Sequence, residues 1–130
     1  MEKQGKLELT WVGKYEEEKL EPRIFIEDEQ YSYGDTSEGN MLIHGDNLIA
    51  LEALQQEYTD KIKCIYIDPP YNTGSAFEHY DDGVEHSIWL SLMRKRLILL
   101  RNLLSDDGFI FVQIDNNEMA YLKILMDEIF

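Results

Sequence analysis

The sequence IKCIYIDPPYNTG, residues 62–74, joins a short apolar run to a turn of unusual composition. Its first six residues are rich in β-branched side chains and predict a buried strand. Asp68 follows that strand, and Pro69 and Pro70 then fix φ and offer no backbone N–H. The Asp68 carboxylate and the proline carbonyls are therefore acceptors with few donors nearby. Tyr71 adds a flat ring beside them, so the turn suits an aminated nucleobase, which combines N–H groups with a stacking face.

Strands and helices are predicted to alternate along the chain around this stretch. Short apolar runs predict strands, and longer runs with one apolar face predict helices. The strands are expected at 41–44, 62–67 and 109–114, and the helices at 47–58, 87–104 and 119–130. Strands joined by helical crossovers pair in parallel. The fold class is therefore α/β, with a mainly parallel sheet and helices on both of its faces.

The first forty residues differ from the rest because they are acidic and only weakly periodic. We expect residues 1–40 to form an N-terminal arm or small subdomain, and the alternating pattern of residues 41–130 to form a second unit. The whole chain carries 26 acidic and 12 basic residues, a formal net charge of −14. This balance counts against nucleic acid as a partner unless a basic surface lies elsewhere.

The chain has a single cysteine and no apolar segment at its N-terminus. Cys64 has no second cysteine to pair with and lies within a strand pattern, so it is expected to be a buried small residue in a reducing compartment. No window approaches the about 18 apolar residues of a membrane span. A cytoplasmic protein without a membrane partner is expected.

Three acidic residues follow predicted strands, where ligands bind in open α/β sheets. They are Asp46, Asp68 and Asp115. An acidic residue between a strand and a helix is also a favoured helix cap, and Asp115 with Glu118 has the spacing of a capping box. Capping therefore competes with ligand binding for Asp46 and Asp115, whereas the prolines after Asp68 set that residue apart.

The tetrapeptide DPPY at residues 68–71 resembles the catalytic motif of amino-group DNA methyltransferases, which use S-adenosylmethionine. The longer string IDPPYNTGS, with GDNLIALEAL before it and LLSDDGFIFVQIDNNEMAYLKILMDEIF after it, resembles the adenine-specific modification subunit of type III restriction systems. The resemblance covers about residues 5–130. It implies a Rossmann-like S-adenosylmethionine-dependent methyltransferase fold, of which residues 41–130 would be the half that carries the catalytic motif.

The resemblance also implies roles for individual residues. Asp68 and the carbonyl of Pro69 would accept hydrogen bonds from the amine of a flipped adenine, Pro70 would set the turn, and Tyr71 would stack on the base. Asp46 matches a family position near the adenosine of the cofactor, and Asp115 matches a strand-end position beside the site. Asn72 and Thr73 match the family's extension of the motif, where they would brace the loop.

The family's glycine-rich cofactor loop has no counterpart here, because no Gly-x-Gly occurs in the 130 residues. In the permuted class that this chain resembles, a target-recognition domain and then that loop follow the catalytic motif. We therefore expect an N-terminal part of a longer enzyme, inactive in isolation, that acts on double-stranded DNA, with a restriction subunit or a second copy as further partners.

Two other functions fit the same residues. Methylation of the 4-amino group of cytosine needs the same acceptors, and a degenerate methyltransferase half could serve as a non-catalytic binding module. His79 and His86 flank Asp81 and Asp82, a grouping of residue types that also occurs in metal sites. Methyl transfer from a sulfonium needs no metal, so no metal site is expected there, and a solvated loop explains these residues.

Overall fold

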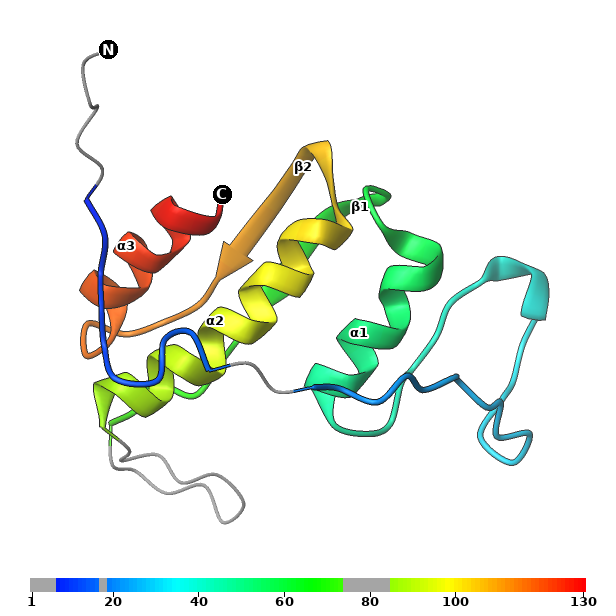
Figure 1. Cartoon of the computed structure of the whole chain (residues 1–130). Helices are drawn as coiled ribbons and strands as arrows, with labels where there is room; N and C mark the ends of the chain where they lie inside the picture. The colour runs from blue at the N-terminus through cyan, green and yellow to red at the C-terminus, as the bar shows by residue number, and fades with distance from the viewer. Residues whose placement is uncertain (1–6, 17–18, 74–84) are drawn as a thin grey trace.

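The computed structural model describes residues 7–16, 19–73 and 85–130, and it forms one small α/β unit with an N-terminal extension (Figure 1). A 3-10 turn, η1 (Thr36–Glu38), precedes helix α1 (Asn47–Tyr58) and strand β1 (Ile62–Ile67). Helix α2 (His86–Leu103) then crosses back to strand β2 (Leu104–Val112), and helix α3 (Met119–Ile129) follows. In the described residues the strands form one two-stranded parallel sheet. The predicted α/β class and parallel pairing are confirmed.

The strands pair in register except at one irregular point near their start. Ile62 pairs with Leu104, but Cys64 pairs with Phe109, so β2 bulges between these pairs. The hydroxyl of Ser105 donates to the Ile62 carbonyl at 3.2 Å within the bulge. A Cβ on Gly108 would lie 2.8 Å from the same carbonyl, which explains a glycine here.

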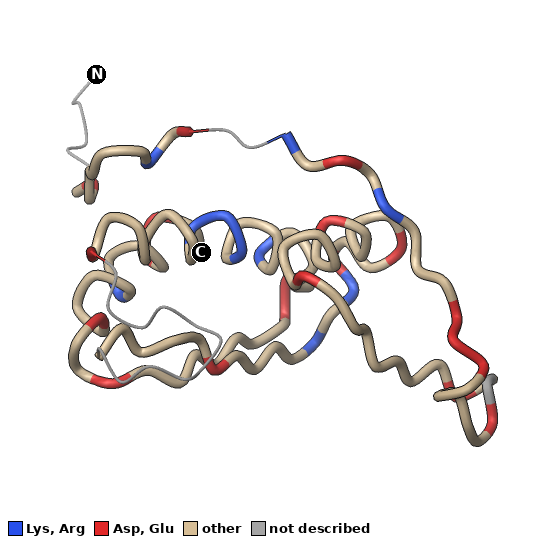
Figure 2. The backbone as a smooth tube through the Cα atoms, turned by 90° about the horizontal axis from the view of Figure 1, so that it is seen from below, with Lys and Arg blue, Asp and Glu red and all other residues tan. Residues whose placement is uncertain are grey.

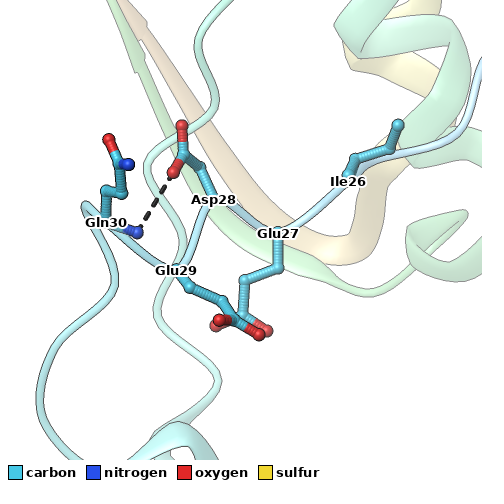
Figure 3. Close-up of a pocket in the computed structure, with 5 residues that line it drawn as sticks. All are labelled: Ile26, Glu27, Asp28, Glu29 and Gln30. Carbon is cyan, nitrogen blue, oxygen red and sulfur yellow. Dashed lines mark hydrogen bonds between the residues drawn. The ribbon is translucent and has the colours of Figure 1, made fainter.

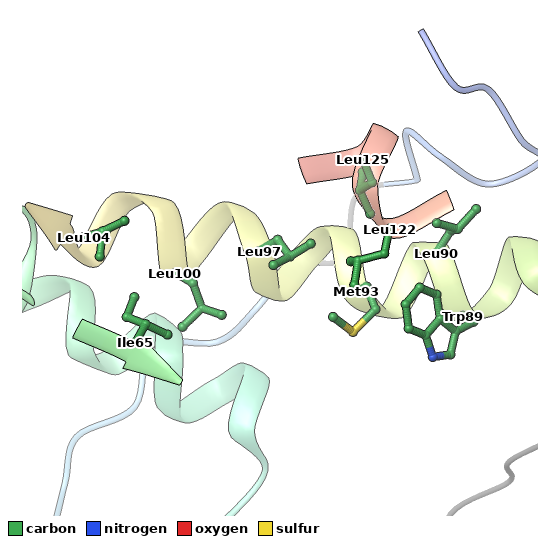
Figure 4. Close-up of a cluster of buried hydrophobic side chains, with 9 residues drawn as sticks. All are labelled: Ile65, Trp89, Leu90, Met93, Leu97, Leu100, Leu104, Leu122 and Leu125. Carbon is green, nitrogen blue, oxygen red and sulfur yellow. The ribbon is translucent and has the colours of Figure 1, made fainter. Parts of the chain in front are cut away.

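Helix α2 supplies most of the hydrophobic core, because its apolar face meets the sheet and α3 (Figure 4). This face is largely the one predicted from the spacing of its leucines. Leu97 of α2 and Leu125 of α3 are both 0 % exposed. The buried cluster consists of Ile65, Trp89, Leu90, Met93, Leu97, Leu100, Leu104, Leu122 and Leu125.

Helices α1 and α3 flank α2, and in the described residues all three helices lie on one side of the sheet (Figures 1 and 2). The side chains of β1 and β2 that alternate away from α2 stay exposed: Cys64, Tyr66, Phe109 and Phe111. The predicted burial of Cys64 is therefore wrong, because Ile65 takes the inward position and strand periodicity turns its neighbour outward. The expectation of helices on both faces is not met within the described residues.

Two predicted strands differ from the structure. Residues 41–44 form no strand, and Leu42 is fully exposed, because this apolar run has no neighbouring strand to pair with in the described part of the chain. The last strand was expected at 109–114, but it begins at Leu104 because the SDDG sequence forms the bulge rather than a free turn. The three helices lie within about one residue of their predicted bounds.

The N-terminal segment 7–16 lies against α2 and α3, on the side of the helices away from the strands (Figure 2). The amide of Leu9 donates to Glu128 at 2.6 Å, and the indole N–H of Trp11 donates to the Ser91 hydroxyl at 2.8 Å. The buried ammonium of Lys14 bonds to Glu128 at 2.8 Å and to Glu8 at 3.0 Å. Residues 7–16 are therefore fixed by a charged cluster as well as by packing.

Residues 19–40 form an extended and largely exposed path between this segment and α1. Asp35 caps η1 by accepting from the Ser37 amide at 2.8 Å. A search of the described residues finds no helix long and apolar enough to cross a membrane.

The docking of residues 7–16 should depend on pH at both extremes. Burial raises the pKa of Glu128, but hydrogen bonds from Lys14 and Leu9 lower it more, so it lies below the ordinary 4.5. Burial lowers the pKa of Lys14, but its bonds to Glu128 and Glu8 raise it above 10.5. The stabilisation by Glu128 is therefore lost as the pH falls through its lowered pKa, and that by Lys14 as the pH rises through its raised one.

Fluorine-labelled tryptophan should show this release, since Trp11 and Trp89 are the two tryptophans in the chain. We expect the NMR signal of Trp11 to move in acid below pH 4.5 and in alkali above pH 10.5. Glu128→Gln, which removes the acid titration, is the control and should abolish the acid transition of Trp11. A Trp11 signal that does not move at either extreme while the core remains folded would contradict the docking scheme.

Candidate active site

The DPPY turn leaves β1 at the carboxyl edge of the sheet, as predicted. Asp68 follows Ile67 directly and is exposed. Because β2 is parallel to β1, Asp115 lies beyond the same edge. The backbone amide of Gln113, just after β2, donates to the Ile67 carbonyl at the end of β1 at 2.9 Å. The predicted placement of Asp68 and Asp115 at one edge is confirmed. The same prediction is wrong for Asp46, which follows no strand because residues 41–44 form none.

The two proline carbonyls have different surroundings. The indole N–H of Trp89, in α2, donates to the carbonyl of Pro70 at 2.8 Å, and the Trp89 side chain is 2 % exposed. Within residues 7–16, 19–73 and 85–130, no hydrogen bond reaches the carbonyl of Pro69. The turn is therefore anchored to the core through Pro70, while Pro69 keeps its acceptor available.

The ring of Tyr71 is half-buried, and its hydroxyl takes part in a chain of polar side chains. The side-chain amide of Gln113 donates through Nε2 to this hydroxyl at 2.7 Å, and its Oε1 accepts from the hydroxyl of Tyr66. The bond from Gln113 lowers the pKa of Tyr71, but the hydrogen bond to Asp68, burial and the charge of Asp68 together raise it above its ordinary value. Tyr71 therefore stays neutral near pH 7.

Asn72 holds the next turn in an unusual backbone conformation, with φ of +60°. Its buried side-chain amide donates to Glu118 at 2.5 Å, and its carbonyl accepts from the side chain of Asn117. The same oxygen of Glu118 lies 2.7 Å from Nδ1 of His86. The motif is therefore tied to the starts of both α2 and α3.

Asp46 and Asp115 both make the local hydrogen bonds expected of turn and cap residues. Asp46 caps α1 by accepting from the amides of Leu48 at 2.8 Å and Ile49 at 3.3 Å. Asp115 accepts from the amide of Asn117 at 2.8 Å, so it closes a turn before α3. The predicted capping box is wrong, because α3 begins at Met119 and the side chain of Glu118 turns inward to Asn72 and His86. Contacts of either aspartate with a cofactor remain predictions.

The pattern of residues 62–130 matches the family of proteins described as DNA methylase. The match covers more than half of the chain and includes the DPPY turn and both strands. The chain belongs to this DNA methylase family. The resemblance read from residues 68–71 and their surroundings is thereby confirmed at the level of the family.

Three relatives are modification subunits of type III restriction-modification enzymes. The probable HindVI subunit of Haemophilus influenzae is 56% identical over 91 residues, which are 70% of this chain and 12% of the relative. The StyLTI subunit of Salmonella typhimurium is 44% identical over an aligned length of 119 residues, and this alignment covers 70% of the present chain and 18% of the relative. The EcoP15I subunit of Escherichia coli is 34% identical over an aligned length of 158 residues, and this alignment covers 94% of the present chain and 24% of the relative. The chain therefore spans less than a quarter of the length of these relatives.

The rest of the described residues hold no site of comparable chemistry. Among the described residues, no group of three His, Cys, Asp or Glu side chains could hold a metal ion. His79, Asp81 and Asp82 lie outside those residues, and His86 contacts Glu118. A surface depression lined by residues 26–30 consists of five consecutive residues of the extended path (Figure 3). All five are exposed, so this depression is a bend of the chain and not a built pocket.

Sequence reasoning missed the two side chains that hold the motif of this DNA methylase in place. Trp89 lies on the apolar face of α2, and the bond that its indole N–H makes to Pro70 has no signature in the sequence. Glu118 was assigned to a capping box because its spacing from Asp115 fits one. The positive φ of Asn72 could have been predicted, because asparagine is among the non-glycine residues that most often adopt positive φ.

Replacing Trp89 by Phe should loosen the DPPY turn. The change keeps an aromatic ring in the core but leaves the carbonyl of Pro70 without its donor, which should lower the free energy of unfolding by about 1–3 kcal/mol. Backbone amide shifts of Tyr71 and Asn72 should change as well. Urea denaturation and two-dimensional NMR measure the two effects.

Trp11→Phe is the matched control, because it removes the other indole N–H and its bond to Ser91. It should lower stability without moving the amide signals of Tyr71 and Asn72. If both variants move those signals equally, the bond from Trp89 to Pro70 has no special role in the turn.

Proposed function

We propose that this DNA methylase chain carries the catalytic motif of an enzyme that transfers a methyl group from S-adenosylmethionine to the 6-amino group of a flipped adenine in DNA. The observation that carries the proposal is the DPPY turn at the carboxyl edge of β1. It presents the exposed Asp68 carboxylate and the Pro69 carbonyl beside the Tyr71 ring. Family membership over residues 62–130 supports the same chemistry.

Two acceptors side by side solve the main difficulty of this reaction. An aromatic amine gives its lone pair to the ring and is a weak nucleophile. Hydrogen bonds from its two N–H groups to Asp68 and Pro69 favour a tetrahedral nitrogen, whose lone pair can attack. S-adenosylmethionine supplies the methyl group on a positively charged sulfur. The nitrogen would form the N–C bond as the S–C bond breaks, the bonding pair would pass to sulfur, and the proton released from the nitrogen would pass to water.

Tyr71 would supply the stacking face for the extruded base. Its hydroxyl accepts from the Gln113 side chain, which restricts the orientation of the ring. Such prior ordering lowers the entropy that the base must lose on binding. The Tyr71 hydroxyl is therefore a positioning group in this scheme, and the ring is the binding group.

Asp46 and Asp115 are the residues proposed to contact the cofactor. Each uses Oδ1 for a local backbone bond, and no described residue bonds to either Oδ2. A carboxylate oxygen with no partner can accept from the hydroxyl or amine groups of an adenosine. Both residues fit the cofactor in this limited sense, within a Rossmann-like fold of which residues 41–130 form the catalytic-motif half.

The partners proposed for the protein follow from its relatives and its charge. The relatives are modification subunits of type III restriction-modification enzymes, so double-stranded DNA and a restriction subunit are the partners proposed here. The net charge of −14 opposes binding to phosphates. A basic surface outside residues 1–130 is therefore part of the proposal, whereas a second copy of the chain remains a prediction.

Expression of the encoding gene in cells that lack adenine methylation should introduce N6-methyladenine, which mass spectrometry of digested DNA detects. Asp68→Ala should lower the rate about 100- to 1000-fold, by analogy with the loss of one oxyanion donor. Asp68→Asn keeps the size and one acceptor and should retain more activity than Ala. N4-methylcytosine in place of N6-methyladenine would overturn the choice of base, and equal activity of Asp68→Ala and wild type would overturn the role of Asp68.

Changes at Tyr71 should separate the ring from its hydroxyl. Tyr71→Ala should cost about 1–3 kcal/mol of stacking, which is about 5- to 150-fold in the rate at low DNA concentration. Tyr71→Phe keeps the ring and should have the milder effect, although it removes the hydrogen bond from Gln113. Methylation rates of both variants, measured with the same DNA, test this order. Equal losses would assign the main role to the hydroxyl.

A further inference from the structure

The most heavily buried acid in the described residues lies next to the catalytic turn. Glu118 is 0 % exposed, and it stands directly before α3. A buried carboxylate is costly unless it is well paired. The side chain does not cap its helix, because no amide of the first turn bonds to it. Its burial therefore requires a different reason from helix formation.

One oxygen of Glu118 joins two other elements. Oε1 accepts from the Asn72 amide at 2.5 Å and lies 2.7 Å from Nδ1 of His86. Asn72 belongs to the motif turn, and His86 begins α2. The His86 ring also lies 4.8 Å from the ring of Tyr121, in α3, which fixes its orientation. Three segments that are distant in sequence therefore meet at a single carboxylate.

The partner of Glu118 is the residue whose backbone most needs support. A non-glycine residue at φ of +60° is strained by a close approach of its Cβ to the backbone. At Asn72 the side chain is held by Glu118 and the carbonyl by Asn117. Two consecutive residues before α3 therefore hold one residue of the turn on both sides. A turn fixed in this way determines where the preceding residues, Asp68 to Tyr71, point.

We propose that Glu118 is a positioning residue for the methyl transfer. It binds Asn72 and maintains the left-handed conformation that sets the direction of Tyr71 and of the acceptors at Asp68 and Pro69. This inference rests on the proposed function. Glu118 touches neither base nor cofactor in this scheme, so its loss should lower kcat more than it raises KM for DNA.

An exchange of groups tests the pairing directly. Asn72→Asp should place a second carboxylate against Glu118 and displace the turn. Glu118→Gln keeps an acceptor for Asn72 and should have a small effect. The double variant Asn72→Asp with Glu118→Gln restores an amide and a carboxylate in exchanged positions, so it should recover most of the loss. Asp127→Asn, on the exposed side of α3, is the control for a general effect of charge.

Two measurements distinguish failure of this inference from failure of the proposed function. In the 130-residue chain, the backbone amide NMR signals of Asp68, Tyr71 and Thr73 should shift in Asn72→Asp and return in the double variant, whether or not the chain methylates DNA. In the expressed gene product, kcat should fall about 100-fold in Asn72→Asp, the size expected for a misplaced reacting group, and recover in the double variant. The KM for DNA should change little.

The inference is overturned if Asn72→Asp leaves the signals of Asp68, Tyr71 and Thr73 in place, or if the double variant is no better than Asn72→Asp. It is also overturned if the thermal midpoints of the variants account fully for their activities, because Glu118 would then only stabilise the fold. Absence of methylation in the wild type would overturn the proposed function but would leave the NMR result as a test of the contact.

Discussion

Parallel pairing of β1 with β2 is the constraint on which the rest of the structure depends. Two parallel strands cannot be joined by a tight turn, so the chain must return along the length of the sheet before the second strand begins. Helix α2 makes this return and places its apolar face on the inward side chains of both strands. Both strands then end at one edge, which brings the DPPY turn beside the residues that lead into α3. The chemistry at Asp68 thus follows from the pairing of backbones some distance away.

The DPPY turn is held by polar contacts that reach into the core. Trp89 bonds to Pro70 from α2, and Glu118 bonds to Asn72 from the start of α3. A buried donor or acceptor is expensive to leave without its partner, so these bonds favour one arrangement of the turn over its alternatives. The Asp68 carboxylate, by contrast, is exposed, and the Pro69 carbonyl accepts no hydrogen bond from the described residues. Rigid support behind an available surface is the arrangement that a pre-organised site requires.

Much of the fold and the main candidate residues could be predicted from the sequence. The helices, β1 and the edge shared by Asp68 and Asp115 follow from periodicity and from the rule for parallel strands. Residues 41–44 were predicted wrongly because an apolar run shows only that a strand would be favourable, whereas its neighbour depends on tertiary structure. Glu118 was misassigned for a related reason: local spacing suggested a cap, and a contact with Asn72, 46 residues away, decided otherwise.

The contact between Leu9 and Glu128 has a consequence for the order in which the protein folds. These residues are 119 positions apart, so the first segment to leave the ribosome finds its place only after Glu128 has been made. At the usual speed of translation, about 5–20 residues per second, the delay is on the order of 10 seconds. Lys14 stays in water during that time, because both α2 and the acidic end of α3 must form before they can bury it. Docking of residues 7–16 on the helices is therefore a late event in the folding of this part of the chain.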